Sequence, residues 1–107
     1  MLNRKFYLQS TVYLLDFFLK GGEIIMAIFL GVHKIPAGME EKAAIEGYEK
    51  YKESAKSKGI HAISAVYNIE KGFAYCQTEA ETADQVREAH EGAAVPLEDV
   101  IEVKSLT

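Results

Sequence analysis

Residues 60–78, IHAISAVYNIEKGFAYCQT, decide the fold of this chain. Apolar and polar side chains alternate through residues 60–69, which is the period of a β-strand. A short turn, EKG at residues 70–72, is followed by a second strand-like run over residues 73–78. Two such runs joined by a short connection predict a β-hairpin.

A helix and a further strand are predicted on each side of the hairpin. Before it, residues 27–33, AIFLGVH, predict a strand, and residues 39–58 predict a helix. The helix has an apolar stripe with members three or four residues apart, Ala44, Tyr48, Tyr51 and Ala55. After the hairpin, residues 79–91 predict a helix and residues 100–106 a last strand. The predicted order is therefore β-α-β-β-α-β.

This order is that of the ferredoxin-like fold, which belongs to the α+β class. Two right-handed crossovers place both helices on one face of a four-stranded antiparallel sheet. We expect Ile28, Leu30 and Val32 to face the helices, which leaves Phe29 on the open face. An open apolar face favours pairing, so we expect a homodimer that forms through this face.

Length, charge and cysteine content restrict the class of protein. A chain of 107 residues, 49% of them hydrophobic and 26% charged, is typical of one soluble globular domain. Its net charge of −4 and the absence of a stripe of Lys or Arg argue against nucleic-acid binding. A single cysteine cannot form an internal disulfide bond. We therefore expect a reducing, cytoplasmic location.

The first 25 residues differ from the rest of the chain. Their apolar run, residues 6–19, is interrupted by an aspartate and is shorter than the about 20 residues of a membrane-spanning helix. No cleavage site typical of a signal peptide follows it, and we expect no membrane association. Residues 21–23, GGE, can be encoded by GGAGGTGAA, which resembles a bacterial ribosome-binding site before Met26. We therefore expect residues 1–25 to be a translated leader, disordered or loosely helical, and residues 26–107 to form the domain.

Three side chains could bind a soft or borderline transition metal, namely His33, Cys76 and His90. In the predicted topology, the strands that carry His33 and Cys76 are neighbours at the centre of the sheet. His90 lies on the helix stripe that faces the sheet. His33 would have to reach round from its strand end, because its side chain has the parity of Gly31 and would point to the open face. The predicted fold allows the three to meet but does not dictate it.

Plainer interpretations of the same residues remain open. A lone cysteine such as Cys76 is more often a small buried hydrophobic residue than a metal ligand. His90 could be a core histidine with a hydrogen-bond partner, and His33 a polar residue at a strand end. No paired C-x-x-C or H-x-x-x-H motif supports a metal site. The remaining histidine, His61, begins a strand and is expected at the surface.

Two other classes of function compete with metal binding. A catalytic Cys-His pair needs a thiol of lowered pKa and partial exposure, whereas Cys76 is predicted in the middle of a strand. There is no Gly-rich phosphate-binding loop in residues 26–107, so we expect no catalytic residues and no enzymatic turnover. The second alternative is a dimeric interaction or small-ligand-binding module, with Tyr48, Tyr51 and Tyr67 lining a pocket between helices and sheet.

Three segments together resemble a known family. They are FLGVHKIPAGM at residues 29–39, GFAYCQTEA at residues 72–80 and VREAHEGAAVPLEDVIEV at residues 86–103. They are similar to small bacterial ferredoxin-like proteins described as nickel-binding or nickel-responsive homodimers. The resemblance covers nearly all of residues 26–106.

The resemblance implies that His33, Cys76 and His90 are ligands of nickel or of another divalent transition metal. Two positions depart from the family pattern. Many members have an acidic residue two positions before the first histidine, where this chain has Gly31, and a second histidine where it has Ala94. The loss of a carboxylate and an imidazole weakens a metal site. The resemblance therefore implies a small metal-binding homodimer or, as the alternative, a module that has lost its metal.

Overall fold

The structure is a computed structural model that describes residues 26–106. Its elements follow the predicted β-α-β-β-α-β order: β1 (Ala27–Lys34), α2 (Glu41–Ser57), β2 (His61–Asn68), β3 (Phe73–Ala80), α3 (Ala83–Gly92) and β4 (Asp99–Val103). The leader predicted for residues 1–25 lies outside the described residues. In the part that is described, no helix is long and apolar enough to cross a membrane.

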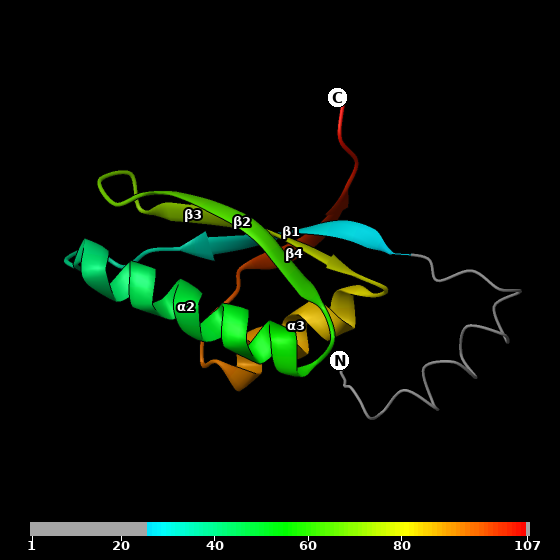
Figure 1. The fold of residues 1–107 in the computed structure, drawn as a ribbon. Helices are drawn as coiled ribbons and strands as arrows, with labels where there is room; N and C mark the ends of the chain where they lie inside the picture. Colours follow the sequence, from blue (N-terminus) through cyan, green and yellow to red (C-terminus); the bar gives the residue numbers. More distant parts are fainter. Residues whose placement is uncertain (1–25, 107) are drawn as a thin grey trace, which may run out of the picture.

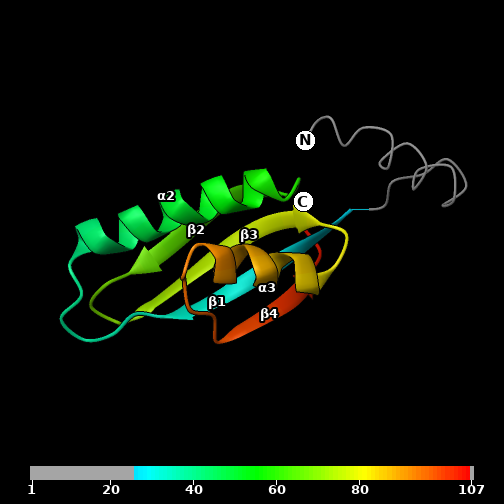
Figure 2. The same cartoon turned by 90° about the horizontal axis from the view of Figure 1, so that it is seen from below.

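The four strands form one antiparallel sheet with the order β2-β3-β1-β4. Both helices lie on the same face of this sheet, as the two views in Figure 1 and Figure 2 show. The ferredoxin-like α+β prediction is therefore confirmed. Because β1 and β3 are the two inner strands, residues that face the helices from these strands lie at the centre of the core.

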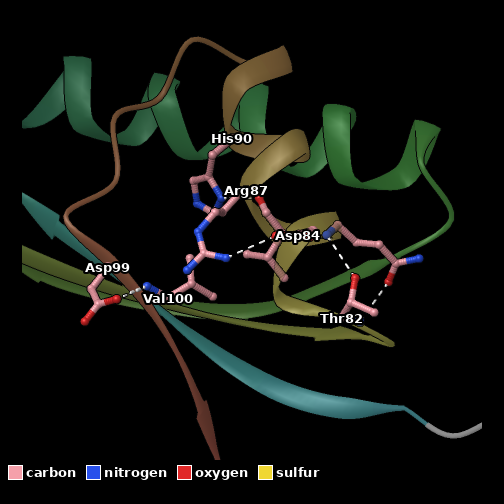
Figure 3. Close-up of polar contacts among 8 residues, drawn as sticks. Thr82, Asp84, Arg87, His90, Asp99 and Val100 are labelled. Atoms are coloured by element: carbon pink, nitrogen blue, oxygen red, sulfur yellow. Dashed lines mark hydrogen bonds and ion pairs between the residues drawn. The ribbon is translucent and has the colours of Figure 1, made fainter.

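The boundary between β3 and α3 differs from the prediction. Residues 79 and 80 were expected in the helix, but they extend β3 and pair with the start of β1. The helix begins only after Thr82, whose hydroxyl accepts a hydrogen bond from the backbone amide of Gln85 (Figure 3). The Gln85 side chain accepts a hydrogen bond from the Thr82 amide in return. This capping box satisfies backbone donors that a longer helix would have left free, and it sets the start of α3.

The prediction for the two faces of β1 is wrong. Phe29 is only 5% exposed and belongs to the core under the helices, whereas Ile28, Leu30 and Val32 face the open side. Phe29 pairs with Thr78 of β3, which is itself fully buried. Side chains alternate along a strand, so the burial of Phe29 moves every second residue of β1 to the helix side.

Side chains from both helices pack against the sheet and form the core. Tyr51 and Ala55 of α2 and Val86 and Ala89 of α3 are buried against the sheet. Among residues 26–106, the buried hydrophobic cluster consists of Phe29, Tyr51, Ala55, Ile60, Cys76, Ala80, Val86, Ala89 and Val100. Two polar side chains, Thr78 and His90, are also buried within this layer. A buried histidine needs a partner for each ring nitrogen.

Candidate metal centre

The fold brings His33, Cys76 and His90 together, although they lie on three different elements. One ligand atom from each residue lies within 4.8 Å of the other two. The Cys76 Sγ atom is 3.4 Å from Nε2 of His33 and 3.5 Å from Nε2 of His90. Cys76 and His90 are 2% and 1% exposed, and His33 is half-buried. The three predicted candidates therefore form one compact and largely buried cluster.

His33 reaches this cluster directly and not by bending round its strand end. It has the same parity as Phe29 and Gly31, and the burial of Phe29 turns that face of β1 toward the helices. Gly31 pairs directly with Cys76 in the sheet. The expectation that His33 must reach round from its strand end is wrong, because the face of β1 that carries it turns toward the helices.

Gly31 provides the space that the thiol occupies. A Cβ atom at this position would lie 2.6 Å from Sγ of Cys76, which is well inside van der Waals contact. It would also lie 3.3 Å from Leu97 and 3.5 Å from Nε2 of His33. The glycine that departs from the family pattern is therefore required by the packing of this cluster.

Backbone carbonyl groups fix the tautomers of both imidazoles. Nδ1 of His33 donates a hydrogen bond to the carbonyl oxygen of Pro96, and Nδ1 of His90 donates one to that of Val86, each at 2.8 Å. A neutral imidazole that donates through Nδ1 has a free lone pair on Nε2. Both Nε2 atoms are the ones that lie beside the thiol of Cys76. Hydrogen bonds of this kind are typical of histidines that bind metals.

Tyr51 of α2 holds the ring of His90 from the other side. The two rings stack with centroids 3.8 Å apart and an interplanar angle of 25°. The Tyr51 hydroxyl and the Thr78 hydroxyl form a hydrogen bond of 2.5 Å within the core. The sequence indicated that Tyr51 belongs to an apolar helix stripe, but it did not indicate contact with His90. Nothing in the spacing of Thr78 or Pro96 marks them as neighbours of the cluster.

Burial shifts the pKa of each group in the cluster toward its neutral form. It raises the pKa of the Cys76 thiol to about 11, against hydrogen bonds from the Gly31 backbone and the Thr78 hydroxyl. Burial also lowers the pKa of His90 to about 4, with a further contribution from His33, and it lowers the pKa of His33 itself. At neutral pH, the cluster therefore consists of a thiol and two uncharged imidazoles.

This electrostatic state argues against nucleophilic catalysis by Cys76. A catalytic thiol needs a lowered pKa, which a helix N-terminus or a neighbouring cation supplies, whereas here burial raises the pKa. For a metal, by contrast, two uncharged imidazoles are already in the state that binds. Only Cys76 would have to lose a proton.

The spacing of the donor atoms fits a metal with wide bond angles. A metal bonded to sulfur at about 2.3 Å and to nitrogen at about 2.0 Å holds these donors about 3.5 Å apart at tetrahedral angles. At right angles, the same bonds would bring the donors to about 3.1 Å. The observed separations of 3.4 and 3.5 Å are close to the tetrahedral value. The chemistry of the three donors and both sulfur–nitrogen separations thus fit a metal.

The other residues singled out in the sequence lie away from the cluster or play different roles. His61 is exposed and lies 3.6 Å from a carboxylate oxygen of Glu79, as expected for a surface residue. The hydroxyl of Tyr67, which is 43% exposed, donates a hydrogen bond to Glu41 at the start of α2. Tyr67 is therefore far too exposed to line an enclosed pocket with Tyr51.

Ala94 follows α3 with a φ of 57° and lines an open cavity of about 520 Å³ beside His90.

Comparison with known proteins identifies the family. The model of the family described as "Nickel responsive protein SCO4226-like" matches residues 29–103, which include all three residues of the cluster. The chain belongs to this family. None of the curated proteins compared with the chain matches it.

Two solved structures share the fold of this SCO4226-like protein. The crystal structure of SCO4226 from Streptomyces coelicolor A3(2) matches with a TM-score of 0.69 and 23% sequence identity, and covers 76% of this chain and 100% of that one. The chemotaxis kinase CheA P2 domain, solved with the response regulator CheY from Thermotoga maritima, matches with a TM-score of 0.50 and 15% identity. That match covers 74% of this chain and 100% of the other. At these identities, both likenesses concern the fold alone.

Proposed function

We propose that this protein binds a transition-metal ion through His33, Cys76 and His90 and acts as a metal-binding or metal-responsive protein without enzymatic turnover. The single observation that carries the proposal is the convergence of the three ligand atoms to within 4.8 Å from β1, β3 and α3. The family described as nickel responsive supports it, since the matched residues include the whole cluster. Nickel is the ion that this family name suggests.

Each residue has a distinct role in the proposed site. His33 and His90 bind through Nε2, because their Nδ1 atoms are held by carbonyl groups. Cys76 binds as a thiolate and supplies the one negative charge. A bound metal would link two strands to a helix, so that it stabilises the folded chain by mass action.

Metal uptake at neutral pH should release one proton from the site. The pKa of Cys76 is raised to about 11, so the thiol carries a proton that the metal displaces, whereas both imidazoles are already uncharged. The apparent affinity should therefore rise about tenfold per pH unit near neutrality. Calorimetric titration in buffers of different ionisation enthalpy measures this proton number, and a value near zero would contradict the role of the thiol.

We also propose that the protein is a homodimer that forms through the open face of the sheet, in the cytoplasm. The register of the strands gathers apolar side chains on this face: Ile28, Leu30, Val32, Val66, Phe73, Tyr75, Ile101 and Val103. Val66 and Ile101 are 61% and 44% exposed in the single chain. A contiguous apolar face of this kind favours association.

The dimer is tested by charge substitutions on the two faces of the molecule. Val66→Lys should reduce the mass measured by light scattering to that of a single chain. Ile45→Lys is the matched control, because Ile45 is similarly exposed but lies on α2, away from the open face. A parent protein that is monomeric, or a Val66→Lys variant that stays dimeric, would argue against this interface.

Native mass spectrometry of the reduced full chain tests metal binding. We expect one metal ion per chain with nickel or zinc, and no uptake by Cys76→Ala. His61→Ala should bind like the parent, because His61 is exposed and outside the cluster. Metal uptake that survives Cys76→Ala would refute the assignment, and so would a loss of uptake in His61→Ala. A chain that takes up no metal would favour the dimeric interaction or small-ligand-binding module.

A further inference from the structure

We infer that the centre formed by His33, Cys76 and His90 selects a monovalent soft ion, copper(I), over nickel(II) and zinc(II). The inference rests on the proposed metal-binding function and specifies the ion for the same three residues. Three features of the structure support it: the charge of the donor set, the spacing of the donors and the burial of the site.

The charge of the donor set matches a monovalent ion. One thiolate and two neutral imidazoles carry a single negative charge, so a monovalent ion forms a neutral complex and a divalent ion leaves one positive charge. Among residues 26–106, no carboxylate belongs to the cluster. Gly31, which faces the thiol, cannot be replaced by an acidic residue without a clash. Nothing within the cluster therefore compensates the second charge of a divalent ion.

Carboxylates around the open cavity beside His90 are the candidates for compensation that the described residues offer. This cavity is lined by Glu91, Glu98 and Asp99, but also by the cationic side chain of Arg87. All four side chains are exposed, so solvent screens their charges. The Asp99 carboxylate accepts a hydrogen bond from the Val100 amide and is turned away from His90 (Figure 3). These groups do not replace a carboxylate inside the site.

Burial makes the uncompensated charge costly. Cys76 and His90 are almost fully buried, and an aromatic ring stacks on His90. An isolated charge in such a site loses its hydration without gaining a counter-charge. A neutral complex avoids this cost.

The nature of the donors leads to the same ion, and their spacing argues against nickel(II). Thiolate sulfur selects soft ions such as copper(I), and a trigonal set of two histidines and one cysteine is the core of blue-copper sites. Square-planar or tetragonal geometry, typical of nickel(II), requires donors at right angles. The separations of 3.4 and 3.5 Å between sulfur and nitrogen exceed the about 3.1 Å of right angles, so they disfavour square-planar nickel(II) and suit copper(I) and zinc(II) alike.

Competition titrations of the reduced full chain under anaerobic conditions test the selectivity. Copper(I) is titrated against bathocuproine disulfonate, and nickel(II) and zinc(II) against a chromophoric chelator of divalent ions. We expect one copper(I) per chain, with a Kd at least about a thousandfold below that of nickel(II) and also below that of zinc(II). A Kd for nickel(II) or zinc(II) equal to or below that of copper(I) would overturn the inference and leave the metal-binding proposal intact. Failure to bind any of the three ions would defeat the metal-binding proposal itself.

A pair of variants separates charge from geometry. Leu97 lies beside the thiol, since its Cδ2 atom is 3.3 Å from the position that a Cβ of Gly31 would take. Leu97→Asp adds a carboxylate beside the site and should reduce the preference for copper(I) over zinc(II) at least about tenfold. Leu97→Asn is the matched control of equal size without charge. If both variants prefer copper(I) over zinc(II) to the same degree, the charge argument is refuted. If neither variant folds, the titrations of the parent protein with copper(I), nickel(II) and zinc(II) decide the inference.

Discussion

Replacement of Gly31 by alanine tests the packing of the cluster most directly. The new methyl group would lie 2.6 Å from Sγ of Cys76, and a normal contact requires about 0.8 Å more. The backbone cannot retreat, because β1 is paired on both sides and Gly31 lies opposite Cys76 on β3 and Val100 on β4. The thiol must therefore move, and it carries with it the contacts to both histidines.

The expected magnitude follows from two opposing effects. Overpacking of a buried site costs about 1–3 kcal/mol. The removal of glycine from a strand recovers about 0.5–1 kcal/mol, because the unfolded chain loses freedom. We therefore expect Gly31→Ala to lower the free energy of unfolding by about 1–2 kcal/mol. Urea denaturation of the reduced full chain at neutral pH measures this difference.

Two comparisons show whether the thiol causes the loss. Gly47 lies in α2 with open space where a Cβ would be, so Gly47→Ala should instead stabilise the chain by up to about 1 kcal/mol. In a Cys76→Ala background the sulfur is absent, and Gly31→Ala should cost little or become favourable. The reasoning fails if Gly31→Ala is as stable as the parent, or if its cost is unchanged in the Cys76→Ala background.

Three further predictions concern the metal-free protein. The pKa of His90 is lowered to about 4, so the unfolded chain binds more protons than the folded chain between about pH 6.5 and pH 4. The free energy of unfolding should therefore fall by about 3 kcal/mol as the pH falls through this window. A free energy of unfolding in urea that does not change with pH would contradict this prediction. Tyr51→Phe removes one hydrogen bond of the buried Thr78 hydroxyl, which keeps the Cys76 thiol as a partner, and should cost about 1 kcal/mol in the same assay, while the ring stack on His90 and hence the metal Kd are retained. Ala94 adopts a left-handed conformation, so Ala94→Gly should raise the melting temperature, corresponding to a gain of about 0.5–1 kcal/mol, and a lower melting temperature would refute the effect of backbone strain.

The amino-acid sequence by itself determined the order of the elements and the candidates for the site. The period of two in the central hairpin and the helical stripe that includes Tyr51 are local patterns, and local patterns depend on neighbours a few residues apart. The three soft or borderline donors were identifiable from residue type alone. The sequence also placed His90 correctly on the helix face that meets the sheet.

Only the tertiary structure decided whether the donors meet. The face of β1 that turns inward depends on which of Phe29 and its neighbours fits between the helices, and a strand apolar on both sides carries no periodic signal for that choice. Phe29, Gly31 and His33 lie on the same face of β1. When Phe29 turns inward, the imidazole of His33 is therefore placed beside Cys76. The tautomers and the pKa shifts follow from burial and from carbonyl groups distant in sequence, which no local pattern contains. The role of Gly31 appears only when β3 lies against it, because the contact that requires a glycine is between strands and not along one.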